Sequence, residues 1–107
     1  MVGELLTDAG LPEPTYEHDV GDDVGRFVAR VDLAYPSDHL AIECDSRRYH
    51  DTAEAFERDP LRRNRLVTAG WRVLNVTWRT FATHPDIVVR TVREALASSH
   101  RLQSRKP

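Results

Sequence analysis

The sequence holds a single cysteine, Cys44, and a single lysine, Lys106. One cysteine cannot form a disulfide within the chain, which is typical of proteins in a reducing cytoplasm. No run of about 18 apolar residues is present, so we expect no transmembrane helix, and the acidic first residues do not resemble a signal peptide. Repeats, low-complexity stretches and an interdomain linker are also missing, so the 107 residues predict one cytoplasmic domain.

Cysteine and histidine spacings typical of zinc sites are missing as well. We expect four histidines at the surface: His18, His39, His84 and His100. Alternation turns Cys44 away from Glu43 and Asp45, so we interpret it as a small core residue rather than a nucleophile. A metal bound by this chain would therefore have oxygen ligands, which favours Mg²⁺ or Mn²⁺ over Zn²⁺.

The charge is unevenly distributed, although the net charge is only −2. Residues 1–60 hold 15 Asp or Glu and 5 Arg, whereas residues 61–107 hold 2 acidic and 10 basic residues. This asymmetry indicates a nucleic-acid partner, or two halves that pack together and neutralise each other. All basic residues but one are Arg, which suits bidentate phosphate contacts.

Apolar patterns and turn residues predict the order of elements. We expect strands over 15–20, 26–34, 40–45 and 71–78. We expect helices ending at Gly10, running from Asp51 or Thr52 to a break at Asp59-Pro60, covering 61–69, and starting near a capping box at 83–86. From Ser98 the periodicity is lost, so residues 1–97 are expected to form the domain and 98–107 a frayed tail.

Three successive strands joined by short turns indicate an antiparallel meander. The fourth strand follows a helical crossover, so it should lie parallel to one of the three. The sequence therefore predicts an α/β fold, a mixed sheet flanked by helices.

Three carboxylates stand in apolar strands, where unpaired charge is costly to bury. Glu43 and Asp45 share a strand face, roughly 6–7 Å apart, and Asp32 reaches the same place if its strand pairs with theirs. Such a group can bind Mg²⁺ or Mn²⁺, activate water and neutralise a phosphate. The alternative is that Asp45 caps a strand end and Glu43 pairs with an Arg such as Arg47 or Arg72.

His50 follows the carboxylates closely. It is a candidate general acid for the leaving oxygen, or an electrostatic partner of the phosphate, because its pKa lies near working pH. The alternative is an ordinary histidine at a helix entry.

Several polar residues can contact a nucleic-acid backbone near the carboxylates. The candidates are Arg47, Arg48, Arg58, Arg62, Asn64 and Arg65. The alternative is a solvated helix surface. Tyr49, Trp71 and Trp78 are candidates for base stacking, but we expect at least one tryptophan in the core.

These residues resemble a known family. Val31-Asp-Leu, Ile42-Glu-Cys-Asp, Tyr49-His50, Arg58-Asp59 with Arg62-Arg-Asn64, and Gly70-Trp-Arg-Val with Thr77-Trp78 resemble the bacterial domain of unknown function 559. That domain is similar to the very-short-patch-repair DNA mismatch endonuclease, in the PD-(D/E)XK nuclease-like superfamily. The resemblance covers roughly residues 4 to 97.

The resemblance implies a restriction-endonuclease-like αβββαβα core and Mg²⁺-dependent phosphodiester cleavage of DNA. Asp32 matches the first metal-binding Asp, Glu43 the acidic residue of the (D/E)XK element, and His50 the histidine of the repair-endonuclease branch. Glu4 matches an acidic residue on the first helix. Asp45 stands where the superfamily usually has Lys, so His50 or an Arg must replace that cation, or the domain does not cleave.

Two further functions remain open. One is a non-catalytic nucleic-acid-binding or regulatory module that keeps the nuclease fold; Arg side chains filling the point between the carboxylates would favour it. The other is a protein–protein module, for example in a toxin–antitoxin or defence system. A homodimer or an upstream domain of a longer protein are further partners to consider.

Overall fold

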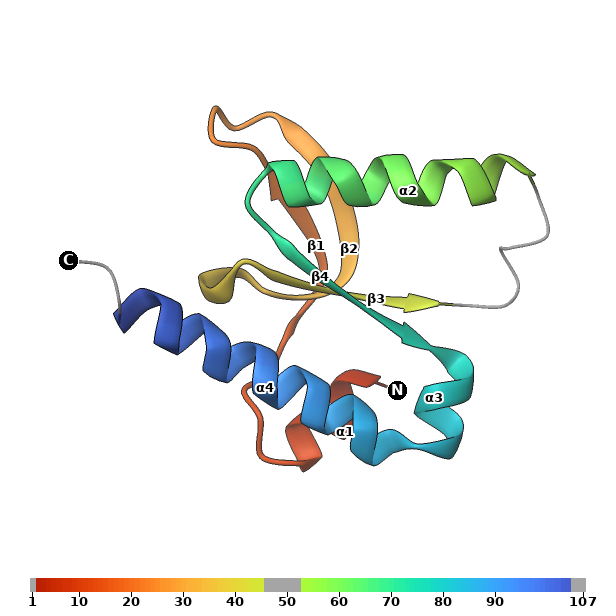
Figure 1. The fold of residues 1–107 in the computed structure, drawn as a ribbon, viewed down its shortest axis with the longest axis vertical. Coiled ribbons are helices and arrows are strands. Elements are labelled where there is room, and N and C mark those ends of the chain that lie inside the picture. The colour runs from red at the N-terminus through yellow and green to blue at the C-terminus, as the bar shows by residue number, and fades with distance from the viewer. Residues whose placement is uncertain (1, 46–52, 105–107) are drawn as a thin grey trace.

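A four-stranded sheet lies between helices in the computed structural model, which describes residues 2–45 and 53–104 (Figure 1). Side chains are described within those ranges except for Asp45, residues 53–59 and residues 100–104. The elements are α1 (Val2–Asp8), β1 (Thr15–Gly21), β2 (Phe27–Tyr35), the 3-10 helix η1 (Pro36–Asp38), β3 (Leu40–Asp45), α2 (Ala53–Thr68), β4 (Arg72–Thr77), α3 (Trp78–Thr83) and α4 (Pro85–Ser104).

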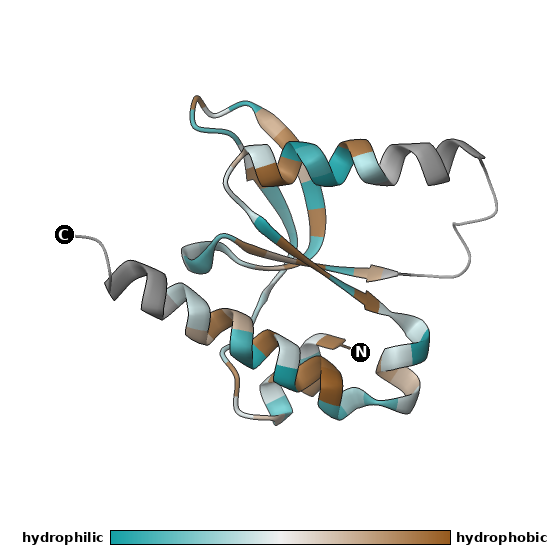
Figure 2. Cartoon of the chain, viewed as in Figure 1, coloured by the Kyte–Doolittle hydropathy of each residue, from teal (hydrophilic) through white to brown (hydrophobic). Residues whose placement is uncertain are grey.

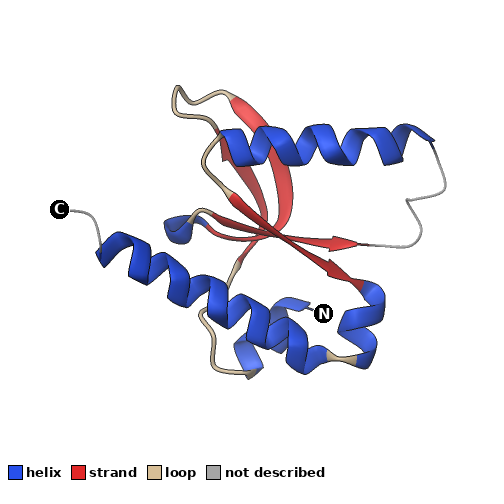
Figure 3. Ribbon diagram, viewed as in Figure 1, coloured by secondary structure: helices blue, strands red, loops and turns tan. Residues whose placement is uncertain are grey.

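The sheet topology confirms the predicted mixed sheet. The strand order is β1-β2-β3-β4, with β1 and β3 antiparallel to β2 and β4 parallel to β3. The first three strands follow one another directly, whereas β4 is reached through α2 (Figure 3). A parallel pair requires such a crossover, because the chain must return to the same end of the sheet.

Two apolar clusters hold the helices to opposite faces of the sheet. On one face Leu33, Ile42 and Val76 pack with residues of α1 and α4. On the other face Ala41 and Trp71 pack with Leu66, the one buried residue among the described side chains of α2. The apolar stretches of β3 and β4 lie between these layers (Figure 2). The predicted core tryptophan is thus Trp71, which is 7% exposed.

The alternation of side chains between the two faces of the sheet is interrupted at one point along β1 and β2. Leu33 belongs to the cluster under α1 and α4, but Val31 belongs to the cluster under α2. Residues two apart normally share a face. The interruption occurs beside Glu17, which has a φ of 47° and lies between the paired residues Tyr16 and His18. A left-handed residue inside a strand interrupts the alternation, and Asp32 lies opposite it.

The predicted helix break at Asp59-Pro60 is wrong. A single helix, α2, runs from Ala53 to Thr68 with Pro60 in its interior. Proline removes one N–H and disturbs the preceding turn, but the remaining hydrogen bonds continue the helix at a cost of about 3 kcal/mol. Packing of Leu66 against the sheet offsets part of that cost.

Two further differences concern the C-terminal third. The strand predicted to reach Trp78 ends at Thr77, whose side chain accepts a hydrogen bond from Thr80 N (3.1 Å) and starts α3. The predicted fraying from Ser98 is wrong for the described part of α4, which extends to Ser104. Ser99 is 6% exposed and is contacted by Arg72 of β4. Packing against the sheet, rather than an apolar periodicity in the sequence, therefore stabilises this part of the helix.

None of the helices in the described ranges is both long and apolar enough to cross a bilayer.

Candidate functional site

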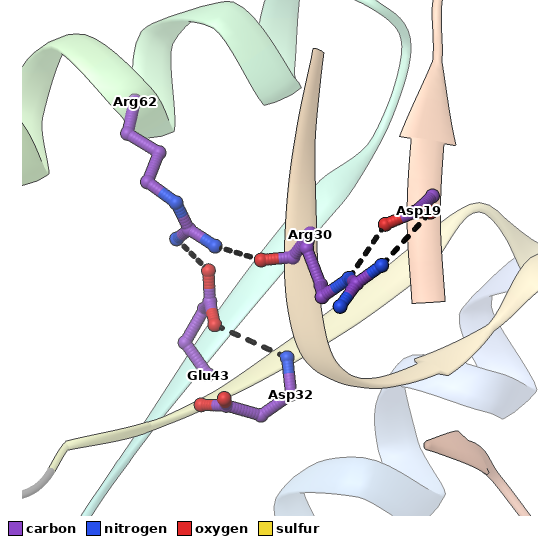
Figure 4. A network of polar contacts seen from close by, with 5 residues as sticks. All are labelled: Asp19, Arg30, Asp32, Glu43 and Arg62. Carbon is purple, nitrogen blue, oxygen red and sulfur yellow. Dashed lines mark hydrogen bonds and ion pairs between the residues drawn. The ribbon is translucent and has the colours of Figure 1, made fainter. Parts of the chain in front are cut away.

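Asp32 and Glu43 lie where β2 and β3 stop pairing. The paired residues of the two strands end at Leu33 with Ile42. The next two residues, Asp32 and Glu43, therefore stand opposite each other at the point of separation. Figure 4 shows both side chains at this place. The sequence predicted that Asp32 and Glu43 would meet, and the structure brings them together.

The two carboxylates accept backbone hydrogen bonds where the pairing of β2 with β3 has ended. Asp32 Oδ2 accepts a hydrogen bond from Cys44 N at 2.8 Å, and Glu43 Oε2 accepts one from Asp32 N at 3.4 Å. Each acid thereby uses one oxygen to satisfy a backbone donor of the opposite strand, which a separating strand pair would otherwise leave unpaired. The second oxygen of each carboxylate is directed elsewhere.

Arg62 of α2 occupies the second oxygen of Glu43. Its Nη1 pairs with Glu43 Oε1, and its Nη2 donates to the backbone oxygen of Arg30 on β2 (Figure 4). The side chains of Arg62 and Glu43 are 33% and 15% exposed. A charged pair this far from water depends on both partners, because either one alone would be a half-buried charge. Arg30 itself is turned outward, toward Asp19 of β1 at 2.8 Å.

Burial and charge shift two pKa values at this site. Burial lowers the pKa of the Arg62 guanidinium, and the charge of Asp32 acts in the opposite direction. An arginine nonetheless stays protonated in a protein. Burial, assisted by the charge of Asp32, raises the pKa of the Cys44 thiol to about 11. Cys44 is therefore neutral at physiological pH, which agrees with the structural role expected of it.

Part of the predicted site lies outside the described residues. Arg47, Arg48, Tyr49 and His50 fall in the range 46–52, and the side chains of Asp45 and Arg58 are not described. The backbone of Asp45 does belong to β3 and is paired with Thr77. The predicted roles of these residues stay predictions.

The described residues of the predicted phosphate-binding set do not act alike. Arg62 points toward the carboxylates and holds Glu43, whereas Asn64 and Arg65 are exposed on α2. Asn64 and Arg65 line a pocket of about 770 Å³ together with Asp22 and Phe27 of the β1–β2 hairpin region. Helical spacing predicted a shared face for Arg62 and Arg65, but only Arg62 reaches the site.

The partner expected for Glu43 also differs. Arg72, one of two candidates, donates instead to Ala95 O at 2.9 Å and contacts Ser99, so it fastens β4 to α4. Arg47, the other candidate, lies outside the described residues. Sequence distance could not identify Arg62, because its position depends on how α2 crosses the sheet.

Glu17 was missed by sequence reasoning. It is exposed and has a left-handed backbone. Together with Asp32, it lines a pocket of about 550 Å³. Nothing in its local sequence marks a left-handed residue, because the feature arises from the interrupted alternation of two paired strands. Non-glycine residues in this conformation are strained by roughly 1–3 kcal/mol and often stand at functional sites.

The donors at the separation point suit a hard cation. Within the described residues, no group of three or more His, Cys, Asp or Glu side chains could hold a metal ion. Mg²⁺ often needs only one or two protein carboxylates and keeps several waters. Asp32 and Glu43 can supply that number, provided that Glu43 exchanges its contact with Arg62.

The chain matches one family model. Residues 9–96 match the family REase_MTES_1575, and this span includes both carboxylates and Arg62. No curated protein and no solved structure matches the chain. The match covers well over half of the sequence, and the mixed sheet with flanking helices is consistent with a restriction-endonuclease-like fold. The chain therefore belongs to REase_MTES_1575, a restriction-endonuclease-like family, and carries a nuclease-type domain.

Proposed function

We propose that this domain hydrolyses phosphodiester bonds of DNA and depends on Mg²⁺ or Mn²⁺. The observation that carries the proposal is the meeting of Asp32 and Glu43 at the separation point of β2 and β3. The two acids come from different strands and are fixed by backbone hydrogen bonds, and Asp32 also lines a pocket. The family supports a nuclease-type domain.

In this proposal Asp32 and Glu43 hold the cation. When bound, the ion supplies charge neutralisation at the phosphate and a water of lowered pKa. The hydrogen bonds from Cys44 N and Asp32 N orient the carboxylates in advance, so little rotational freedom is lost on binding. Asp45, two residues beyond Glu43, is a proposed third ligand or water-orienting base. His50 is a proposed general acid.

Arg62 is the cation that we assign to the place of the missing motif lysine. The sequence has an acid, Asp45, where the superfamily that it resembles usually carries Lys, so a positive charge must come from elsewhere. Arg62 reaches Glu43 from α2 and is anchored on the Arg30 carbonyl. A guanidinium there can stabilise negative charge that develops on a phosphate. The closer relation to domain of unknown function 559 and very-short-patch-repair endonucleases belongs to the same proposal.

Two measurements on purified protein test this function. The first is nicking of supercoiled plasmid with and without Mg²⁺, and the second is Mn²⁺ binding by calorimetry. Asp32→Asn and Glu43→Gln should each abolish nicking and weaken Mn²⁺ binding. Asp86→Asn is the matched control, because that carboxylate is exposed on α4 and forms only a surface pair. Nicking that persists in Asp32→Asn would contradict the proposal.

A second function is favoured by one specific observation. Arg62 already occupies Glu43, and a permanently neutralised acid would leave a non-catalytic nucleic-acid-binding module with the nuclease fold. That module would bind DNA with a strong salt dependence, show no metal-dependent nicking, and bind no Mn²⁺ while Arg62 holds Glu43. Mn²⁺ binding by the unchanged protein therefore separates the two functions. If Arg62 only competes with the cation, its removal should tighten Mn²⁺ binding by roughly tenfold, about 1.4 kcal/mol.

A further inference from the structure

A pocket of about 550 Å³ adjoins the candidate metal site through Asp32. We call it the Trp78 pocket. Its walls come from all four strands, from α1 and from α3, with Tyr16, Glu17, Asp32, Cys44, Trp78 and Phe81 among the lining residues. Because Asp32 belongs to both places, a group held in the pocket lies next to the Asp32 carboxylate.

Two exposed aromatic rings line this pocket. Trp78 is 59% exposed and Tyr16 is 47% exposed. Trp78 is the first residue of α3, and the Thr77 side chain caps that helix through Thr80 N. The backbone that carries the indole is therefore fixed, and stacking against it would cost little conformational entropy. A base stacked on an aromatic ring typically gains about 1–3 kcal/mol.

A close backbone approach helps to form one wall. A Cβ built on Gly3 of α1 would lie 2.2 Å from the hydroxyl oxygen of Tyr16. Only glycine at this position lets the Tyr16 ring lie against α1. A larger residue would move the ring, and the ring is part of the pocket lining.

The polar groups of the pocket select a base rather than a phosphate. Glu17 and Asp32 contribute carboxylates, and the described lining includes no Lys, Arg or His. Carboxylates repel phosphate and accept hydrogen bonds from exocyclic amino groups, as Asp and Glu do from cytosine N4. Thymine presents O4 instead of an amino group. Arg79, the next residue of α3, is exposed and can contact the backbone outside the pocket.

We infer that the Trp78 pocket binds an unpaired, amino-bearing nucleobase of a DNA strand whose neighbouring phosphate lies at Asp32 and Glu43. The base stacks on Trp78, its amino group donates to Glu17, and the strand continues past the carboxylates. The preferred substrate is therefore single-stranded DNA or a duplex with an unpaired cytosine, adenine or guanine, the three bases that carry an exocyclic amino group. This inference rests on the proposed function for the identity of the polymer, but not for the occurrence of cleavage.

Tryptophan fluorescence tests the inference without cleavage. Trp78 is exposed and Trp71 is buried, so a stacked base should quench mainly Trp78. We expect short single strands of dC and dA, added in EDTA, to quench the emission, and dT to quench and bind less. A strand of the same length made of abasic sites should not quench. Equal quenching by the abasic strand would overturn the inference.

Variants give a second readout by fluorescence anisotropy of labelled dC strands. Trp78→Leu should weaken binding by roughly 5- to 150-fold, which is the stacking energy expressed as affinity. Trp78→Phe should retain most of the affinity. Phe27→Leu is the matched control, because Phe27 is 69% exposed but lines the other pocket. An equal loss in Phe27→Leu would overturn the inference.

Glu17→Gln tests the choice of base. It should reduce the preference for dC over dT, while leaving the abasic strand unaffected. Failure of the proposed function is distinguishable: base-dependent quenching without any metal-dependent nicking would contradict the endonuclease and support the pocket. Nicking with an unchanged KM in Trp78→Leu would contradict the pocket and support the endonuclease.

Discussion

Arg62 of α2 and Glu43 of β3 form a half-buried ion pair beside Asp32. The pair joins a helix to the strand that carries the candidate metal ligand. It also places a positive charge beside the two carboxylates. The stability of the fold and the chemistry of the site therefore depend on the same two side chains.

The first prediction concerns the energy of this pair. Arg62→Gln should lower the free energy of unfolding by about 1–3 kcal/mol, because Glu43 is left as a half-buried charge without its partner. Glu43→Gln should cost a similar amount, and the double variant should cost less than the two together. Urea denaturation measures all three. Arg65→Gln, an exposed neighbour on α2, should change stability by less than about 0.5 kcal/mol. Additive losses would contradict a direct interaction.

The second prediction concerns Pro60, which stands inside α2 and is exposed. Pro60→Ala should raise the free energy of unfolding by about 1–3 kcal/mol, because alanine restores an N–H and removes the ring clash. The midpoint of urea denaturation measures it. If the helix really ended at Asp59, as the sequence suggested, alanine would bring no such gain, and an unchanged midpoint would contradict the continuous helix.

The third prediction concerns the left-handed backbone of Glu17. Glycine adopts positive φ without a Cβ clash, so Glu17→Gly should be more stable than Glu17→Ala by about 1 kcal/mol. In an ordinary strand the order is reversed, because glycine loses more chain entropy. Both variants remove the carboxylate, so the comparison isolates the backbone. A more stable alanine variant, in thermal or urea denaturation, would show that Glu17 is not strained.

The fourth prediction concerns alkaline pH. Burial raises the pKa of Tyr35 to about 12 and that of Cys44 to about 11. Both groups are neutral when protonated and have lower pKa values in the unfolded chain. Their contribution to stability is therefore complete below about pH 9 and is lost as the pH rises through the folded values.

Urea midpoints measured between about pH 8 and pH 12 should therefore fall with rising pH. Tyr35→Phe should flatten the fall, because it removes one titrating group, although it also loses the hydrogen bond from Tyr35 Oη to Pro12 O at 2.8 Å. A wild-type midpoint that stays constant over this range would contradict the prediction.

Local patterns were sufficient for most of the fold. Alternation located the strands, Gly10 and Gly70 ended α1 and α2, and the long crossover before β4 indicated its parallel pairing. Predictions that depended on single residues failed where packing outweighed them. The helix α2 continues through Pro60 while Leu66 packs against the sheet, and Ser99 of α4 is contacted by Arg72 of β4.

The candidate site could be predicted only in part. The strand pattern brought Asp32 and Glu43 together, because antiparallel neighbours of known register must meet. The partner of Glu43 depended on how α2 lies across the sheet, so Arg62 could not be chosen over other arginines. The places of Glu17 and the exposed Trp78 beside the site could not be predicted. They depend on an interrupted strand alternation and on a helix start, and neither leaves a periodic signal in the sequence.

The most direct test of the central claim is a crystal soaked in Mn²⁺ and measured at the manganese absorption edge. The account predicts an anomalous peak between the carboxylates of Asp32 and Glu43, with the Arg62 guanidinium withdrawn from Glu43 Oε1. Both features should be lost in Glu43→Gln. A well-ordered site with no peak, and with Arg62 still paired to Glu43, would contradict it.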